Sequence, residues 1–161
     1  MKSPSLQIGN QIFNWGARTV VMGILNITPD SFSGDGLMSS GDMLEQSVRQ
    51  AEHFLRHHVD ILDVGGESTR PGAQTVTADE ELERVIPVIQ ALHKNFAEAI
   101  ISIDTYKAKV AEEAFKAGAH ILNDVWALRA DPELASVAKK FNVPVILMHN
   151  RSNPATVEVR E

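Results

Sequence analysis

Hydrophobic and polar positions alternate along this chain on two scales. Five short apolar runs, at about residues 20–25, 61–62, 100–103, 121–122 and 145–148, each stop at one polar or ionisable side chain. Between these runs lie longer segments in which apolar residues recur every three or four positions, which is the spacing of an amphipathic helix. Continuous apolar runs are typical of strands buried on both faces of a parallel sheet. The pattern therefore predicts repeated strand and helix units around a mostly parallel sheet.

Five polar residues follow these runs: Asn26, Asp63, Asp104, Asn123 and His149. The carboxyl ends of parallel strands lie at one edge, where such sheets bind ligands. Asp104 and Asn123 are the strongest candidates for ligand binding, because a buried carboxylate or amide needs a partner. Asp104 has an alternative role as the cap of the following helix. Asp63 keeps a structural or undetermined role, and His149 fits packing and ligand contact equally well.

Four helices are predicted from the apolar periodicity and from capping signals. The first crosses residues 43–55, the second begins at a capping box in residues 77–80, and the third runs from about residue 107 to a glycine cap at residue 118. The fourth is expected to start at residues 131–133, with an aspartate as its cap and a proline in its first turn. Pro87 lies inside the second helix and predicts a kink or a break there.

Two architectures fit this alternation, an open doubly wound sheet and a closed (β/α)8 TIM barrel. The chain contains neither G-x-G-x-x-G nor G-x-x-x-x-G-K-[ST], so no nucleotide motif supports the open sheet. A barrel delivers the last residue of each strand to one shared mouth, which suits the polar residues above. A barrel also needs about 250 residues and eight strands. The pattern predicts five strands in 161 residues, so the alternatives are an open sheet and part of a longer barrel.

Composition excludes several classes of function. The formal net charge is −6, without a basic stripe, which argues against a nucleic-acid or membrane partner. There is no cysteine, so a disulfide framework, a thiolate metal site and a cysteine nucleophile are excluded. No G-x-S-x-G motif supports a serine nucleophile. Because no segment reads as a signal peptide or a membrane span, we expect a cytoplasmic protein.

The loops after the first two predicted strands carry most of the polar chemistry. Residues 26–36 are long for a strand-to-helix turn and rich in glycine, which predicts a mobile lid. Residues 65–72 place Arg70 and two hydroxyl side chains among glycines, which suits an oxyanion, although an ordinary turn fits equally well. His53 and His57 have the spacing of metal ligands, but their amphipathic segment favours a solvated helix flank.

Five segments together resemble the dihydropteroate synthase family in order and spacing. They are MGILNITPDSF (22–32), DVGGESTRPG (63–72), SIDT (102–105), ILND (121–124) and LMH (147–149). The resemblance implies an α/β fold, a (β/α)8 barrel of which this chain holds about the first five units. Residues 1–161 would then be the N-terminal part of a single pterin-binding barrel domain. It also implies a transferase of folate biosynthesis that condenses 6-hydroxymethyl-7,8-dihydropterin diphosphate with 4-aminobenzoate, giving 7,8-dihydropteroate and diphosphate.

The same resemblance implies roles for individual residues. Asp104 and Asn123 would bind the pterin, Thr69 would lie at the pterin diphosphate site, and Asn26 would ligate Mg²⁺ or contact the diphosphate. The two loops that would close over 4-aminobenzoate contribute Asp30, Ser31, Phe32, Asp35, Ser68, Arg70 and Pro71. No residue is assigned as a nucleophile, because the reaction implied is a direct displacement of diphosphate.

Some parts of the family pattern differ or have no counterpart here. Asp35 is displaced by one position, and Tyr106 and Ala108 stand where Ser and Pro are common, which predicts a different start for the next helix. The family's later Asp-Pro-Gly-Phe-Gly-Phe, Ser-Arg-Lys and Arg-x-His segments are absent from these 161 residues. We therefore expect a homodimer only for a full-length protein, and no turnover from this chain alone. A non-catalytic pterin-binding module and a pterin-dependent methyltransferase domain remain as alternatives.

Overall fold

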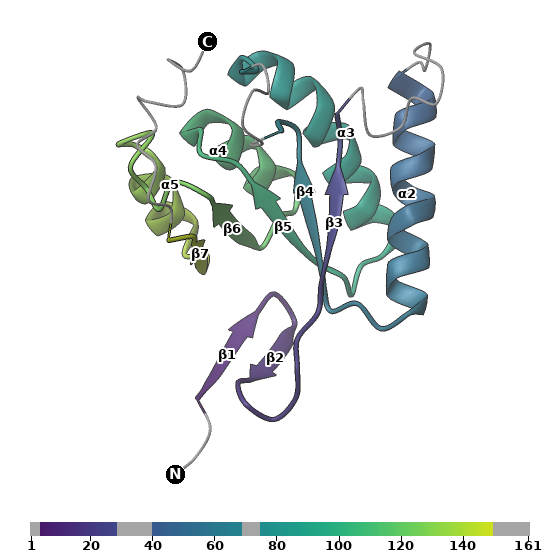
Figure 1. Cartoon of the computed structure of the whole chain (residues 1–161). Coiled ribbons are helices and arrows are strands. Elements are labelled where there is room, and N and C mark those ends of the chain that lie inside the picture. The colour runs from purple at the N-terminus through teal and green to yellow at the C-terminus, as the bar shows by residue number, and fades with distance from the viewer. Residues whose placement is uncertain (1–3, 29–39, 69–74, 150–161) are drawn as a thin grey trace.

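A parallel sheet with helices on one face forms the body of the molecule (Figure 1). The computed structural model describes residues 4–28, 40–68 and 75–149. Within them, the strands are β1 (Ser5–Ile8), β2 (Gln11–Asn14), β3 (Met22–Asn26), β4 (Ile61–Gly65), β5 (Ile100–Asp104), β6 (Ile121–Asp124) and β7 (Val145–Leu147). The helices are α2 (Ser40–Arg56), α3 (Ala78–Asn95), α4 (Ala108–Ala117) and α5 (Leu134–Phe141). None of the described helices is long and apolar enough to cross a membrane.

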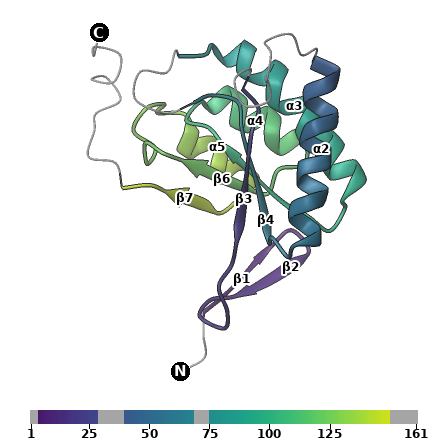
Figure 2. The same ribbon diagram turned by 45° about the vertical axis from the view of Figure 1, so that its right-hand side comes forward.

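The order of the strands distinguishes between the two predicted architectures. Strands β3 to β7 pair in parallel and in sequence order, β3-β4-β5-β6-β7. A doubly wound sheet reverses its strand order at a switch point and has helices on both faces. Here the described helices α2 to α5 lie on one face (Figures 1 and 2). The sheet is therefore the wall of a barrel, and β3 and β7 are its two edges within the described residues.

The face under the helices carries the main hydrophobic core. Leu25, Leu62, Val64, Ile101 and Ile103 are fully buried there, against apolar side chains of the four helices. Successive residues of a strand point to opposite faces. This periodicity explains why one strand supplies both the core and the polar residues described below.

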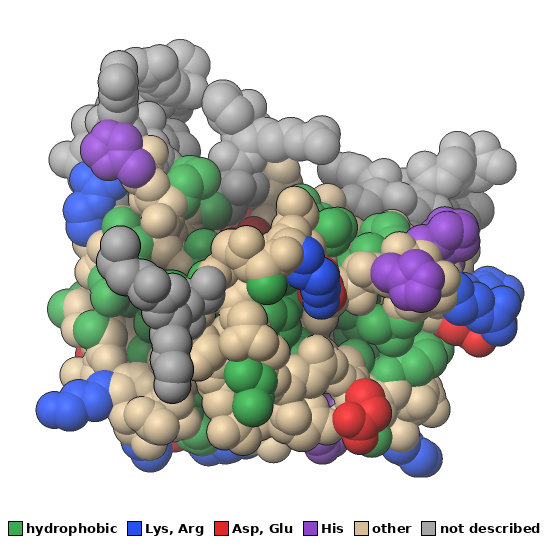
Figure 3. All heavy atoms as spheres, turned by 90° about the horizontal axis from the view of Figure 1, so that it is seen from below, with side chains coloured by type: hydrophobic (Ala, Val, Ile, Leu, Met, Phe, Trp, Pro, Cys, Tyr) green, Lys and Arg blue, Asp and Glu red, His purple; other side chains and the backbone are tan. Residues whose placement is uncertain are grey.

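Among the described residues, the opposite face is covered only at the amino ends of its strands. Ile8 and Phe13 of the β1–β2 hairpin pack there against Ile61, Ile100 and Ile121. Further toward the carboxyl ends this cover stops, and Ile24 of β3 is 57% exposed and Ile146 of β7 is 40% exposed. In a closed barrel this face points inward. Viewed from the hairpin end, hydrophobic side chains reach the surface in several places and most charged ones lie near the edge (Figure 3).

The N-terminal hairpin was not predicted from the sequence. β1 and β2 pair antiparallel with Ile8 opposite Gln11, so that Gly9 and Asn10 form a two-residue turn. Gly9 has a φ of +56°, which glycine adopts without strain and which suits such turns. The sequence signal that could have found the hairpin is therefore this Gly-Asn pair.

Three of the four helices begin and end close to the predicted positions, with two corrections. The predicted break at Pro87 is wrong: α3 runs unbroken from Ala78 to Asn95, held by the Thr77 capping box and by buried Val85 and Ile89. The predicted start at residues 131–133 is also wrong, because α5 begins at Leu134. Asp131 instead accepts hydrogen bonds from the backbone N–H of Glu133 (2.9 Å) and from that of Ala108 (2.8 Å). Asp131 thus caps the start of α4.

Candidate functional site

The carboxyl-terminal halves of β4, β5 and β6 bring three predicted polar residues together. In the register of the sheet Asp63 lies opposite Ser102, and Asp104 lies between Gly65 and Asn123. Asp63, Asp104 and Asn123 share the face opposite the helices, because the residues that alternate with them belong to the helix-side core. Asp63 is not at the end of its strand, as the apolar run suggested, since β4 continues to Gly65. It is a central residue whose side chain belongs to the candidate site.

The side chains of Asp63 and Asn123 form a hydrogen-bonded pair on the face of the sheet opposite the helices. The Asn123 side-chain N–H₂ donates to Asp63 Oδ2 at 3.0 Å, and Asp63 is only 3% exposed. Burial raises the pKa of Asp63, while the nearby Ser102 hydroxyl and the Asn123 amide oppose that rise. The Ser102 hydroxyl does not close a hydrogen bond of good geometry, so it and Asp63 Oδ1 have no partner among the described residues. The pair fixes the Asn123 amide and leaves its carbonyl oxygen available to a ligand.

Asp104 is the carboxylate that this arrangement leaves open. Its side chain makes no hydrogen bond to a residue within the described ranges, and burial together with the charges of Asp63, Glu81, Asp124 and Glu67 raises its pKa to about 7. The alternative role as a helix cap is wrong, because the start of α4 is bonded by other residues. The Thr105 hydroxyl accepts from the N–H of Lys107 at 3.2 Å, and Asp131 accepts from that of Ala108. Asp104 can therefore offer both carboxylate oxygens to a ligand.

Next to Asp104 lies a second cluster of charged groups, which the sequence did not suggest. The Tyr106 hydroxyl donates to both oxygens of Glu67, at 3.0 and 3.1 Å. Lys107 Nζ bonds the carboxylates of both Glu67 and Glu81. Burial lowers the pKa of Lys107, but these two carboxylates outweigh it and raise the pKa overall. Tyr106 therefore contacts Glu67, two positions after the end of β4, and its effect on the start of the next helix stays a prediction.

Asp124, the last residue of β6, faces the helix side and has a structural role. It is fully buried and accepts hydrogen bonds from the N–H groups of Trp126 (2.8 Å) and Leu128 (2.5 Å). These bonds hold the turn after β6, in which Ala127 and Leu128 both have positive φ angles of 54° and 61°. The adjacent Asn123 and Asp124 thus serve opposite faces of the sheet.

The other predicted site residues are placed only in part. Asn26 ends β3 opposite Gly65, is exposed, and makes no side-chain hydrogen bond to a described residue. Ser68 is half-buried just beyond β4, and His149 is exposed beyond β7, so His149 does not pack into the core. The remaining ones lie outside the described residues: Asp30, Ser31, Phe32, Asp35, Thr69, Arg70 and Pro71. No group of three or more His, Asp or Glu side chains that could hold a metal occurs in the described part of the chain.

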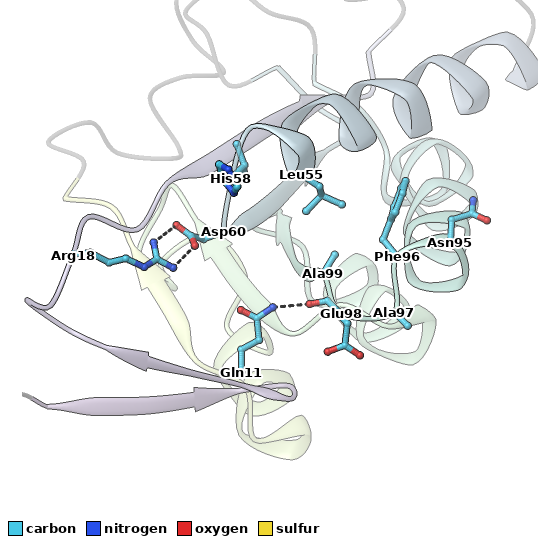
Figure 4. Close-up of a pocket in the computed structure, with 11 residues that line it drawn as sticks. Gln11, Arg18, Leu55, His58, Asp60, Asn95, Phe96, Ala97, Glu98 and Ala99 are labelled. Atoms are coloured by element: carbon cyan, nitrogen blue, oxygen red, sulfur yellow. Dashed lines mark hydrogen bonds and ion pairs between the residues drawn. The ribbon is translucent and has the colours of Figure 1, made fainter.

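A cavity of about 820 Å³ lies at the other end of the sheet, next to the hairpin (Figure 4). Three of its polar side chains, those of Gln11, Arg18 and Asp60, are already paired. Arg18 donates to both oxygens of Asp60, at 2.5 and 2.8 Å, and Gln11 donates to the Glu98 backbone carbonyl at 2.6 Å. The Arg18 guanidinium lowers the pKa of Asp60. The cavity lies beside the hairpin, away from the Asp104 carboxylate at the other end of the sheet.

The fold and the site define an α/β protein of the barrel type that gathers polar groups at the carboxyl ends of its strands. The family described as pterin binding enzyme matches residues 22–161. The chain belongs to this pterin-binding enzyme family.

Two curated relatives that the chain resembles are dihydropteroate synthases. The chain is 54% identical over 134 residues to the dihydropteroate synthase of Bacillus subtilis, covering 83% of this chain and 46% of that protein. It is 50% identical over 148 residues to that of Clostridium beijerinckii, covering 92% of this chain and 54% of that protein. The chain thus spans about half the length of the curated relatives it matches.

Solved structures of the same enzyme share the fold. The dihydropteroate synthase of Xanthomonas albilineans with 4-aminobenzoic acid matches with a TM-score of 0.83 and 43% identity, over 93% of this chain and 53% of that one. The enzyme of Clostridium difficile in the presence of pteroic acid matches with a TM-score of 0.81 and 50% identity, over 88% of this chain and 52% of that one. These neighbours are TIM barrels, which confirms the predicted fold class.

Proposed function

We propose that this chain is the pterin-binding part of a dihydropteroate synthase, which joins 4-aminobenzoate to 6-hydroxymethyl-7,8-dihydropterin diphosphate. The observation that carries the proposal is the open Asp104 carboxylate beside the Asn123 amide, which Asp63 holds in place. Membership of the family and the enzyme name of its relatives support the same assignment.

Asp104 and Asn123 have the chemistry to recognise a pterin. The aminopyrimidine edge of a pterin presents two parallel N–H donors, and an ionised carboxylate accepts both. The Asn123 carbonyl oxygen adds an acceptor, because its N–H₂ group is engaged by Asp63 at 3.0 Å. Leaving such polar groups unpaired in a buried site is costly, so a ligand without the matching donors is rejected.

The reaction that we propose is a displacement at the methylene carbon of the pterin. The C–O bond to diphosphate breaks, the amine nitrogen of 4-aminobenzoate forms the new C–N bond, and the nitrogen then loses a proton. Negative charge develops on the leaving diphosphate, so fixed donors and cations, not a protein nucleophile, are the useful catalytic groups. Thr69 would contact the pterin diphosphate. The loop residues Asp30, Ser31, Phe32, Asp35, Ser68, Arg70 and Pro71 would exclude water from the second substrate.

Asn26 fits a role as a magnesium ligand. It is exposed at the carboxyl end of β3, and its amide oxygen has no partner among the described residues. Mg²⁺ in nucleotide and phosphate sites takes one or two protein oxygens and completes its shell with water and substrate phosphates. Bound there, the ion would supply positive charge to the leaving diphosphate.

Partners and location follow from the same proposal. The substrates are small molecules, and the net charge of −6 supports neither a nucleic-acid nor a membrane partner. We also propose a homodimer for the full-length protein, and a cytoplasmic location.

The proposal is tested on the full-length protein with the pterin diphosphate and 4-aminobenzoate. Product formation together with tight binding of the pterin is the expected result. Pterin binding without consumption of 4-aminobenzoate would overturn the synthase assignment and leave the two alternatives, a non-catalytic binding module and a methyltransferase domain. If the protein does not bind a pterin at all, the proposal is wrong. The 161-residue chain alone is expected to show no turnover, because the later segments of the family are not in it.

A further inference from the structure

We propose that Tyr106 and Lys107 are positioning residues that hold Glu67, and with it the chain just after β4, in a fixed place beside Asp104. The inference rests on the proposed function, because it concerns how the pterin site is kept in shape. It assigns roles to Tyr106, Lys107, Glu67 and Glu81 that the likeness to the family does not provide.

The first part of this clamp comes from the segment that follows β5. Tyr106 and Lys107 lie two and three positions after Asp104, and both contact Glu67, two positions after the end of β4. The Tyr106 hydroxyl spans both Glu67 oxygens at 3.0 and 3.1 Å. The chain leaving β4 is therefore tied to the strand that carries the candidate pterin carboxylate.

The second part of the clamp comes from helix α3. Arg84 donates to the backbone carbonyl of Gly66 at 2.8 Å, and Lys107 also bonds Glu81, which is 1% exposed. A Cβ on Gly66 would lie 2.8 Å from Val85 Cγ1 and 2.9 Å from Glu81 Cγ. Only glycine allows the chain and the helix to approach this closely. Gly66 and Glu67 are thus held from α3 on one side and from the β5–α4 segment on the other.

Lys107 also balances the charge that faces Asp104. Acidic groups reach Asp104 from each neighbouring element: Asp63 on β4, Glu67 after β4, Glu81 on α3 and Asp124 on β6. Lys107 is the cation that bonds two of them, Glu67 and Glu81, and its side chain is only 15% exposed. Without this cation the negative charges of Glu67 and Glu81 would face Asp104 with no counter-charge from Lys107. Asp104 would then ionise only at higher pH.

Variants of the two residues separate positioning from simple stability. Tyr106→Phe removes one hydroxyl and no charge, and Tyr106→Ser introduces the residue that is common in the family. Lys107→Met removes the cation and leaves the carboxylates of Glu67 and Glu81 without a counter-charge, which can unfold the protein. Lys107→Arg keeps the charge and serves as the rescue. Lys109→Met is the matched control, since Lys109 is an exposed lysine of α4 whose one ion pair within the described residues is with exposed Asp79.

The test uses the full-length protein and two kinds of readout. Hydrogen exchange of the backbone amides at residues 66–68 reports on the clamp without any ligand. We expect exchange about 10-fold faster in Tyr106→Phe than in the wild type, because one hydrogen bond to a charged group is lost. Exchange in the β1–β2 hairpin, which packs at the amino ends of the strands, should not change in that variant, nor should exchange at residues 66–68 in Lys109→Met.

The second readout is pterin binding between about pH 6 and pH 9. In Lys107→Met the midpoint of the rise in affinity with pH should move upward by about one unit, and Lys107→Arg should restore it. In Tyr106→Phe the midpoint should stay close to that of the wild type.

The outcomes separate failure of the inference from failure of the proposed function. If exchange at residues 66–68 and the pH midpoint are unchanged in both variants, the positioning role is overturned even when the wild type is active. If Lys107→Met does not fold, the exchange result from Tyr106→Phe decides. If the wild type binds no pterin, the proposed function fails, and unchanged exchange would overturn the clamp separately.

Discussion

The acidic side chains at the two ends of the parallel sheet differ in their hydrogen bonding and in the direction of their pKa shifts. At the amino end, Asp60 is held by both arms of Arg18 and by the backbone N–H of Val21, and the β1–β2 hairpin covers the strands. At the carboxyl end, Asp63 and Asp104 lie near each other on one face, and the Asp104 side chain has no hydrogen bond within the described residues. The pKa of Asp60 is lowered, whereas those of Asp63 and Asp104 are raised.

This difference indicates what each end contributes. Paired charges and a packed hairpin stabilise the fold at the amino end, as is usual for the face of a barrel away from its active site. A buried carboxylate kept near a like charge lowers stability, and such costs persist where they serve a ligand. The carboxyl end of the sheet, where buried like charges lower the stability, is therefore the end that we expect to bind the pterin.

The largest effect is expected from Asp104→Asn. In the full-length protein this change should weaken pterin binding by about 100-fold, because an amide cannot accept two parallel N–H donors. It should also raise the free energy of unfolding at pH 8 by about 2 kcal/mol, since an ionised carboxylate with a raised pKa is removed. Calorimetric titration and urea unfolding measure the two effects. Asp79→Asn, at an exposed acid of α3, is the control, and a loss of stability in Asp104→Asn would contradict the account.

The pH dependence should differ between the two ends. Pterin affinity should rise about tenfold per pH unit below pH 7 and level off above it, because the ligand selects the ionised form of Asp104, whose pKa is about 7. For stability, the folded pKa of Asp104 lies above its ordinary value of 3.8. Its contribution is therefore fully present below that value and is lost as the pH rises toward 7. An affinity that falls through this range would contradict the assignment of Asp104.

Asp60 should show the reverse dependence on pH. Its folded pKa lies below the ordinary value, so its contribution is present above that value and is lost as the pH falls. Urea unfolding of Asp60→Asn and Asp104→Asn across the acid range measures the two contributions separately. If the stability changes caused by both substitutions varied with pH in the same direction, the two ends of the sheet would not differ as described.

A smaller effect is expected from Asp60→Asn at neutral pH. The change weakens the contacts with Arg18 and Val21 and should lower the free energy of unfolding by about 1 kcal/mol, because much of the Arg18 pair is screened by solvent. Pterin affinity should stay within about twofold of the wild type, since hydrogen bonds at this end do not reach Asp104. Added salt should reduce the stability difference. A large loss of pterin affinity in this variant would show that the two ends are coupled.

Much of the sheet could be predicted because burial on both faces leaves a clear apolar pattern. The runs before Asn26, Asp104 and Asn123 correspond to β3, β5 and β6, and the polar residues do lie at the carboxyl end. The hairpin at residues 5–14 was missed because only Ile8 and Phe13 of its side chains are buried. With one buried residue in each strand, the periodicity is too weak to detect.

The site was predictable only where one residue carries the chemistry. Asp104 and Asn123 follow apolar runs, so position alone identified them. Asp63 was assigned a lesser role, because the sequence does not reveal that Asn123, 60 positions later, bonds it. The contacts of Lys107 with Glu67 and Glu81 join residues 40 and 26 positions apart. In the sequence, Lys107, Glu67 and Glu81 have the pattern of ordinary surface charges. Only the folded structure, with β4 and β5 paired in parallel, brings them together.

The most direct test of the central claim is a crystal structure of the full-length protein with a bound pterin. We expect both Asp104 carboxylate oxygens at about 2.7–3.0 Å from the N–H groups of the aminopyrimidine edge, with the Asn123 amide still donating to Asp63. A pterin bound elsewhere, or an Asp104 side chain that contacts only water in the complex, would contradict it.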